Sequence, residues 1–262
     1  MPKASTSETP YTVPAVNRSI QILRYLQRNK QVTVTDVSQA LGIGPSTCYA
    51  ILKTLQKHNF IAFDERAKTY SLGLALLELG GSVSRDFTSV HKARSHLSTF
   101  ARNTGLTVFV SARASHEHLL VVDREEPLGD VHISIAIGTR FRITEGLSGR
   151  CFMAYLPKDE CDALMDSAEL HPFASLPAPS PATYRAQLLA TKKAGFVTLV
   201  DLSQSGSNGV AAPIFDSEGR ILFAVAAMGL GPSITGKAIK ETGANLRRTT
   251  DLITQSLNET AT

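Results

Sequence analysis

Near the start of the chain, apolar residues recur at intervals of three and four, which is the spacing of an amphipathic helix. The period predicts a helix over residues 14–29 with a core face formed by Val16, Ile20, Leu23 and Leu26. Residues 1–13 are polar and rich in Ser, Thr and Pro, so we expect them to form a disordered tail.

Two further helices are predicted next, with a tight turn between them. Thr33 and Asp36 have the spacing of a capping box, with Asp in place of the usual Glu. The helix that they begin is predicted to bury Val37, Ala40 and Leu41. Gly42 ends this helix, and Pro45 suits the first position of the next one because its φ is fixed and it lacks an N–H.

The helix that begins at Pro45 has one apolar and one polar face. Its predicted core side is Cys48, Ile51, Leu52 and Leu55. Its outward side is Ser46, Thr47, Tyr49, Ala50, Lys53 and Lys57. Asn59 then suits a left-handed helix end.

Two strand-like runs, 60–63 and 69–72, flank a polar turn and predict a two-stranded wing that carries Arg66 and Lys68. Residues 14–73 are therefore predicted to form a winged helix-turn-helix. This layout mainly serves to place one helix in the major groove of DNA. The alternative from the pattern alone is an ordinary helical hairpin.

The charge distribution favours DNA. Residues 1–85 carry 10 Lys and Arg against 5 Asp and Glu, whereas residues 86–262 carry 17 against 18, so the net charges are +5 and −1. A basic excess confined to the small domain fits phosphate neutralisation. The cations whose positions in the predicted elements favour DNA contact are Arg18, Lys53, Lys57, Arg66 and Lys68. Ordinary solvated surface positions are expected for Arg24, Arg28 and Lys30.

Residues 74–90 predict a linker helix that frays at Gly80-Gly81 and leaves an apolar face with Leu74 and Leu77. Residues 91–258 are long enough for one domain with its own core. Strands are predicted at 106–111, 119–123, 131–137, 196–200, 209–215 and 221–228. Helices are predicted at about 90–103, 149–156, 158–167, 180–193 and 234–257. The mixture indicates an α+β domain.

In order and spacing, five segments resemble the IclR family of bacterial transcriptional regulators over nearly the whole chain. They are AVNRSIQILRYL, VTDVSQALGIGPSTCYAILKTL, TYSLGLALLELG, AIGTRFRITEGLSGRCFMAYLP and VAAPIFDSEGRILFAVAAMGLGP. The resemblance implies a GAF-like effector-binding domain over residues 91–258, joined by the linker helix to the winged helix-turn-helix. It also implies a homo-oligomer, a dimer or a dimer of dimers, on a palindromic operator in double-stranded DNA.

By the same resemblance, Ser46, Thr47 and Tyr49 are the residues nearest the bases. The chain departs from many relatives at Ala50, where they carry an Arg, so the operator sequence does not carry over.

The resemblance also implies a small organic effector, held between the last two strands and the turn before the helix that begins near residue 149. A Gly-containing turn that opens a helix presents free N–H groups to an anionic group. The candidate effector-binding residues are Phe109, Ser134, Glu145, Gly146, Leu147, Ser148, Gly149, Asn208, Gly209, Ala226 and Met228. Ser148 is expected either to cap the helix or to contact the ligand. Glu145 and Asn208 are equally expected to satisfy their own turns, and Ser134 shares a strand face with His132 that lines the pocket or faces solvent.

Positions that often carry Ser or Cys in relatives that bind small carboxylates are Gly209, Ala226 and Met228 here. We therefore expect an aromatic or otherwise largely apolar acid, with Phe109, Leu147 and Met228 against its body.

Catalytic and metal signals are weak. Ser148 lies in G-L-S-G-R, which lacks the second glycine of a nucleophile elbow, and Ser207 has no better context. His116-Glu117-His118 has no two further ligands at suitable spacing. We expect no enzyme, no metal and no cofactor, and three cysteines that behave as small hydrophobic residues.

The chain has no apolar run long enough to cross a bilayer, so we expect a cytoplasmic protein that does not associate with membranes. Its expected function is the control of a catabolic operon in response to the effector. The alternatives are an enzyme with an accessory winged helix and a pure protein-interaction adaptor.

Overall fold

The computed structural model describes residues 12–86, 88–127, 132–167, 179–200, 206–231 and 234–259. The chain divides into two compact units, 1–87 and 88–262. Most of the tail predicted over residues 1–13 lies outside the described residues.

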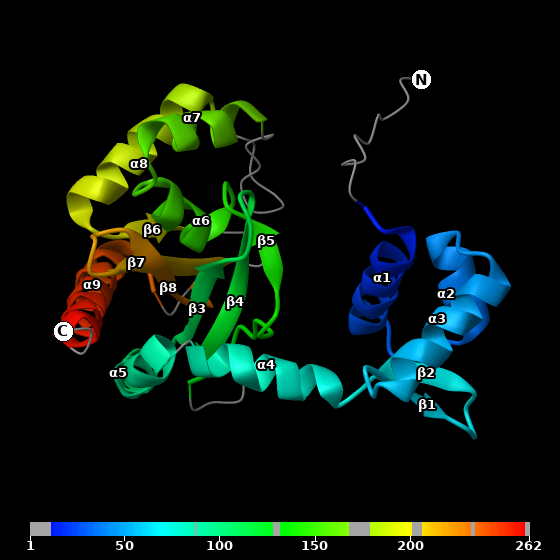
Figure 1. The fold of residues 1–262 in the computed structure, drawn as a ribbon. Coiled ribbons are helices and arrows are strands. Elements are labelled where there is room, and N and C mark those ends of the chain that lie inside the picture. Colours follow the sequence, from blue (N-terminus) through cyan, green and yellow to red (C-terminus); the bar gives the residue numbers. More distant parts are fainter. Residues whose placement is uncertain are drawn as a thin grey trace. The chain divides into compact units, whose positions relative to one another are not determined.

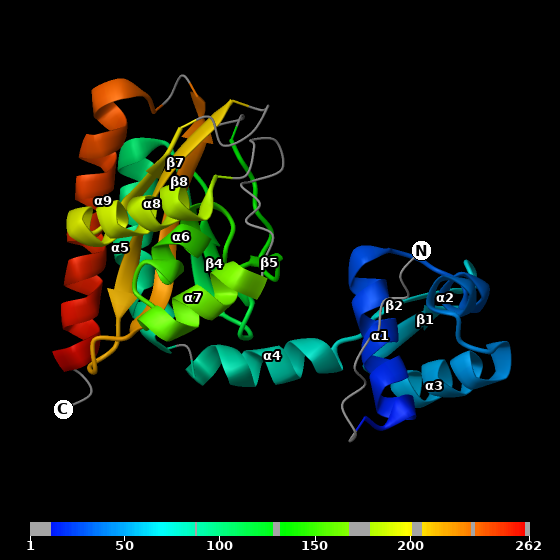
Figure 2. The ribbon, with the colours of Figure 1, turned by 90° about the horizontal axis from the view of Figure 1, so that it is seen from above.

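The N-terminal unit contains the predicted helices and wing (Figures 1 and 2). Its elements are α1 (Pro14–Arg28), α2 (Val34–Leu41), α3 (Pro45–Lys57), β1 (Ile61–Asp64), β2 (Thr69–Leu72) and α4 (Ala75–Asp86). The capping box of Thr33 and Asp36 is present, and Gly42 ends α2 in the left-handed conformation. Asn59 also adopts a positive φ, of 57°. These local predictions are confirmed.

The predicted core face of α1 is partly wrong. Ile22 is fully buried and Leu26 is 3% exposed, whereas Val16 and Ile20 are 55% and 44% exposed. The helix carries two overlapping apolar stripes, and periodicity does not distinguish the stripe that meets α3 from the one that faces outward.

One position on α2 also differs from the prediction, because Ala40 is exposed and Ser38 is buried. The Ser38 hydroxyl donates to the carbonyl of Ile43 at 2.6 Å, which satisfies the buried polar group.

The expected fraying at Gly80-Gly81 is wrong, because α4 continues through both residues to Asp86. A Cβ at either glycine would have no neighbour within 4 Å. These are open surface positions, where glycine weakens a helix by about 1 kcal/mol relative to alanine without a steric reason to break it.

The C-terminal unit is an α+β domain, as predicted, built on a six-stranded antiparallel sheet of order β5-β4-β3-β8-β7-β6. Its strands are β3 (Thr107–Arg113), β4 (His118–Glu125), β5 (Arg140–Arg142), β6 (Val197–Leu199), β7 (Ser207–Phe215) and β8 (Ile221–Leu230). Its helices are α5 (Thr88–Thr104), α6 (Gly146–Met153), α7 (Lys158–Ser167), α8 (Pro181–Ala194) and α9 (Gly236–Glu259).

The predicted strand 131–137 is wrong in its described part, because residues 132–136 join no ladder. After a turn at Gly138, with φ of 88°, Arg140–Arg142 pair with β4 instead and form the edge strand of the sheet. The apolar residues of the predicted strand, Ile133 and Ile135, do pack against the core. Alternation therefore detected their burial but not their lack of strand pairing.

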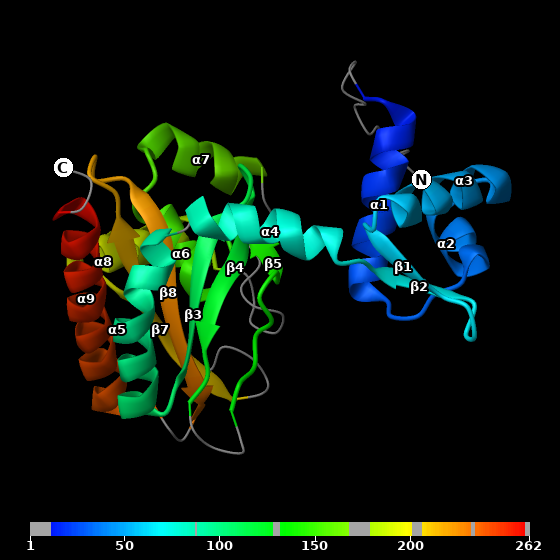
Figure 3. The same ribbon diagram turned by 60° about the horizontal axis from the view of Figure 1, so that its bottom comes forward.

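Helices cover both faces of the sheet. α5 and α9 lie side by side over one face, while α6, α7 and α8 lie over the other (Figures 1 and 3). The main core lies beneath α6, between its residues and those of β3, β4, β7 and β8. This layer brings together four of the residues predicted for effector binding, which are Phe109, Leu147, Ala226 and Met228.

Candidate functional site

The outward face of α3 presents the residues predicted to reach bases. Ser46, Thr47 and Tyr49 are exposed, and Tyr49 keeps 51% of its surface accessible. On the opposite face, Cys48 and Leu52 are fully buried. One packed face and one polar face suit a helix that enters a groove about 12 Å wide.

Lys53 is held by groups from two elements. Its Nζ donates to Gln56 Oε1 at 3.2 Å. The same ammonium group lies 5.6 Å from the ring centroid of Tyr49 and 5.5 Å from that of Phe63 on β1. Each such cation–π contact stabilises an exposed cation by about 0.5–1 kcal/mol. Lys53 is therefore positioned between α3 and the wing.

The wing turn is built around Asp64. Its Oδ1 accepts hydrogen bonds from the backbone N–H of Ala67 at 3.0 Å and of Arg66 at 2.8 Å, and these bonds hold the pKa of the carboxyl below its usual value. Lys68 has a φ of 55°, and its Nζ lies 3.0 Å from Glu65 Oε2. Arg66 and Lys68 are both exposed.

A backbone bridge fixes the wing to the helices. Val32 N–H donates to the carbonyl of Tyr70 at 3.3 Å, and Tyr70 N–H donates back at 2.7 Å. The two other predicted cations, Arg18 on α1 and Lys57 at the end of α3, are exposed. Every cation predicted to contact DNA is thus at the surface of this unit.

In the C-terminal unit, the turn before α6 opens the helix without a side-chain cap. Gly146 has a φ of 65°, and Glu145 at the N-cap position makes no capping bond. The first N–H groups of α6 are therefore not used by a capping side chain. Gly149 is needed for close packing, because a Cβ there would lie 2.5 Å from the carbonyl oxygen of Ile143.

Ser148 is not the helix cap, since it lies inside α6 and is 1% exposed. Its hydroxyl accepts a hydrogen bond from the fully buried Ser111 at 3.1 Å. The second expected role, ligand contact, stays a prediction. Ser111 was missed by the sequence reasoning, although its spacing of two residues from Phe109 places both on one face of β3.

The apolar residues predicted for the site come together on the central strands. Phe109 on β3 is opposite Ala226 on β8, and Met228 on β8 is opposite Gly209 on β7. Leu147 of α6 lies over Gly209, since a Cβ on Gly209 would lie 2.5 Å from Leu147 Cδ1 and 2.9 Å from Met228 Cγ. The two side chains fill the space that the glycine leaves.

Two predicted residues lie outside this group. Asn208 is buried, and its Nδ2 donates to the carbonyls of Ile234 at 2.8 Å and Gly231 at 3.3 Å, so it holds the chain after β8. Ser134 is exposed, and its hydroxyl donates to Glu126 Oε1 at 2.8 Å.

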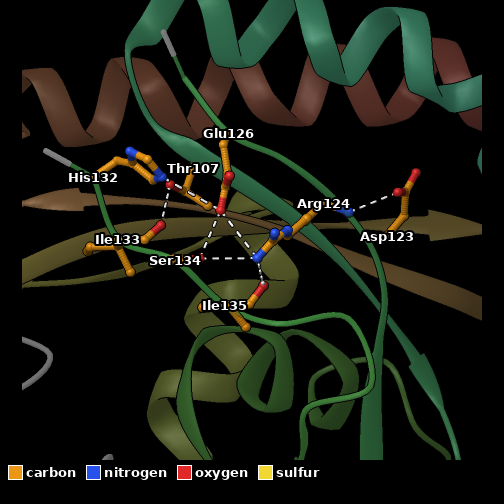
Figure 4. A network of polar contacts seen from close by, with 8 residues as sticks. All are labelled: Thr107, Asp123, Arg124, Glu126, His132, Ile133, Ser134 and Ile135. Carbon is orange, nitrogen blue, oxygen red and sulfur yellow. Dashed lines mark hydrogen bonds and ion pairs between the residues drawn. The ribbon is translucent and has the colours of Figure 1, made fainter. Parts of the chain in front are cut away.

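Figure 4 shows Glu126 at the centre of this polar network. Arg124 Nη1 lies 3.2 Å from Glu126 Oε1, and His132 Nε2 lies 3.6 Å from it. The bond from Ser134 is the main reason that the pKa of Glu126 is lowered. Arg124 also donates to the carbonyl of Ile135 at 3.1 Å, so the network ties residues 132–135 to β4.

The contacts behind the α6 turn were not predicted either. Tyr184 of α8 is buried, and its hydroxyl donates to the carbonyl of Thr144 at 2.9 Å. The Arg150 guanidinium lies 5.7 Å from the Tyr184 ring centroid. Burial lowers the pKa of Arg150 and raises that of Tyr184. No local spacing relates position 184 to position 144, so only the fold brings them together.

Within the described ranges, no group of three or more His, Cys, Asp or Glu side chains has an arrangement that suits a metal ion. Burial raises the pKa of the Cys48 and Cys151 thiols, which keeps them neutral. Among the helices that the structure describes, none is both long and apolar enough to cross a membrane.

Comparisons with known proteins match each of the two units to a model of the same protein family. A family model described as "Bacterial transcriptional regulator IclR C-terminal" matches residues 85–255, and one described as "IclR helix-turn-helix domain" matches residues 15–65. The chain is 27% identical over 214 residues to the HTH-type transcriptional regulator XynR of Escherichia coli K12, covering 81% of this chain and 84% of that protein.

Solved structures have the same fold. The crystal structure of an IclR transcriptional regulator from Alicyclobacillus acidocaldarius gives a TM-score of 0.81 at 24% identity, covering 94% of this chain and 99% of that one. An IclR homolog from Microbacterium hydrocarbonoxydans, complexed with 4-hydroxybenzoate, gives 0.80 at 18% identity, covering 93% and 98%.

The first family model alone spans more than half of the chain, and the described fold combines a winged helix-turn-helix with the effector-type domain that this model represents. Members of this family are transcriptional regulators and not enzymes. The chain therefore belongs to the IclR family of bacterial transcriptional regulators.

Proposed function

We propose that this regulator binds a palindromic operator as a homo-oligomer and controls a catabolic operon in response to a small organic acid. In this proposal, Ser46, Thr47 and Tyr49 reach base edges. The phosphate contacts come from Arg18, Lys53, Lys57, Arg66 and Lys68. The observation that carries the DNA part is the exposed polar face of α3 beside a wing cation and a lysine held in place between two rings.

Footprinting on DNA that flanks its own gene tests this part. We expect a compact, symmetric protected site whose affinity falls steeply with salt, because phosphate contacts release counterions. Diffuse protection without symmetry would contradict the proposal.

Exposed apolar side chains support the homo-oligomer. In the N-terminal unit, five large apolar side chains on α1, on α4 and just before α4 are each more than 40% exposed. They are Val16 and Ile20 on α1, Leu74 just before α4, and Leu77 and Leu79 on α4. Such surfaces on one small unit are typical of protein interfaces. Light scattering on the full chain is expected to give a dimer or tetramer, and Leu77→Lys is expected to shift it toward smaller species. A monomer at micromolar concentration would contradict this assembly.

For the effector, we propose an aromatic or largely apolar acid bound between α6 and strands β3, β7 and β8. Support comes from the apolar group of Phe109, Leu147, Gly209 and Met228, and from the uncapped start of α6, which suits a carboxylate. The structural neighbour that holds 4-hydroxybenzoate is consistent with this class.

Calorimetry with a panel of aliphatic and aromatic acids tests the effector class. Binding only of glyoxylate-sized acids would contradict it. The proposal also couples effector binding to operator binding. This coupling requires that the effector bind the DNA-competent and DNA-incompetent arrangements with different affinity, and operator affinity measured at saturating effector tests it. Unchanged operator affinity would refute the coupling without touching DNA recognition itself.

A further inference from the structure

Phe63 is an apolar residue at the wing surface whose position is set from inside the unit. It lies opposite Tyr70 in the β1–β2 ladder, and the two ring centroids are 4.6 Å apart with a tilt of 41°. Tyr70 is 3% exposed and belongs to the core of the unit. The Phe63 ring, itself partly buried, is therefore attached to a rigid support.

Two ammonium groups from different elements meet at this ring. Lys53 Nζ on α3 lies 5.5 Å from the Phe63 ring centroid, and Lys68 Nζ at the end of the wing turn lies 5.9 Å from it. Lys53 is also close to Tyr49, so the four residues form a continuous ladder of alternating rings and cations from α3 to the wing.

Bringing two like charges to one ring is unfavourable in the free protein, since they repel each other and lose side-chain freedom. Lys68 also adopts a φ of 55°, a backbone conformation that favours glycine. A duplex offers the compensating charge, because it carries one negative charge per roughly 1.7 Å of its axis. Lys68 pairs with the carboxylate of Glu65, but both side chains are exposed, and such pairs are weak.

We propose that Phe63 is a positioning residue for DNA binding, whose ring holds Lys53 and Lys68 as a matched pair of phosphate contacts. The inference rests on the phosphate contacts proposed above for the two lysines. Its physical basis is preorganisation, since a lysine that is already held loses less conformational entropy when it binds a phosphate.

The test uses the full chain and two probes: a duplex selected by the wild-type protein from a random library, and a mixed-sequence duplex. Phe63→Leu removes the ring and keeps an apolar side chain. Phe60→Leu is the matched control, because Phe60 is a half-buried aromatic residue in the same segment. Phe63→Tyr retains the ring, and Lys53→Met with Lys68→Met removes both cations.

We expect Phe63→Leu to weaken binding to both probes about fivefold, because both lysines would then have to be ordered at the moment of binding. The salt slope of log K should be unchanged, because both lysines still reach phosphates. The double lysine variant should reduce that slope by about 1.8. Phe63→Leu should have no further effect in the double lysine background, and Phe63→Tyr should restore wild-type affinity.

The double lysine variant tests the phosphate contacts, and the Phe63 variants test the positioning role of the ring. If the double lysine variant keeps both affinity and slope, the proposed phosphate contacts are wrong and the inference falls with them. If that variant behaves as expected but Phe63→Leu matches Phe60→Leu in affinity, or weakens binding equally without the lysines, Phe63 has only a structural role.

Discussion

Tyr49 in the N-terminal unit keeps half of its surface exposed, whereas Leu147 in the C-terminal unit keeps 2%. The same contrast holds for the two groups to which they belong. The proposed DNA contacts lie at the surface, and most of them fall within residues 46–68. The apolar effector candidates are buried beneath α6 and come from positions as far apart as Phe109 and Met228.

The difference bears on how each unit can work. A surface site can be set in place before its partner arrives, as the contacts around Lys53 illustrate. A buried site in a close-packed core must change before it accepts a ligand. Because the Leu147 and Met228 side chains occupy the space over Gly209, we expect effector binding to require their displacement, which links ligand affinity to a rearrangement of α6.

The largest expected effect is from filling the space over Gly209. In Gly209→Val, the new Cβ would lie 2.8 Å from the carbonyl of Ala227, which cannot move as a side chain can. We expect a loss of about 3 kcal/mol in the stability of the C-terminal unit, measured by urea unfolding with circular dichroism. Gly80→Ala, at an open position, should stabilise its helix instead. Equal stability of Gly209→Val and wild type would mean that the core is not tightly packed there.

For the surface site, removing Lys53 and Arg66 together should weaken DNA binding roughly 30-fold at 0.15 M salt and reduce the salt slope by about 1.8. Fluorescence anisotropy with a labelled operator at several salt concentrations measures both. The matched control is Arg24→Met with Arg28→Met, two exposed arginines assigned to solvent. A similar loss in the control would show a diffuse charge effect and not a defined contact.

The buried hydroxyl pair sharpens the contrast within the C-terminal unit. Ser111→Ala leaves the Ser148 hydroxyl without the donor at 3.1 Å and should cost about 1–2 kcal/mol of unfolding free energy. The double variant with Ser148→Ala should recover most of this loss, because no buried hydroxyl is left unpaired. If the two single-variant losses of unfolding free energy, measured by urea titration, simply add in the double variant, the hydroxyls of Ser111 and Ser148 do not interact. Ser46→Ala, on the exposed face of α3, should leave stability unchanged.

Lys68 should separate stability from function at the surface site. Lys68→Gly relieves the positive φ and is expected to raise stability by about 0.5–1 kcal/mol, while it weakens DNA binding about fivefold through loss of one phosphate contact. Thermal unfolding and anisotropy on the same preparation test the two effects. A simultaneous loss of stability would show that the Lys68 contacts support the fold.

The smallest expected effect concerns pH. Hydrogen bonds from the Thr33 backbone and side chain lower the pKa of Asp36 in the native state. A carboxyl with a lowered native pKa stabilises the fold above its unfolded pKa, and this contribution is lost as pH falls through the native value. Melting temperatures of the N-terminal unit should therefore decline below about pH 4, and less so in Asp36→Asn. An identical pH profile for the variant would exclude this contribution.

Sequence patterns predicted more of the N-terminal unit than of the C-terminal unit. The capping box at Thr33, the turn at Gly42 and Pro45, and the wing around Asp64 were determined by residues a few positions apart. Caps and turns act through such local bonds, so sequence patterns were enough to place them.

The buried stripe of α1, the partner strand of β4 and the environment of Ser148 were decided only by the tertiary structure. Each depends on packing between segments distant in sequence, and several arrangements satisfy the same local pattern of apolar residues. The amino-acid order thus specified two folded units and the exposed polar face of α3. The three-dimensional packing decided which of its buried residues lie together beneath α6.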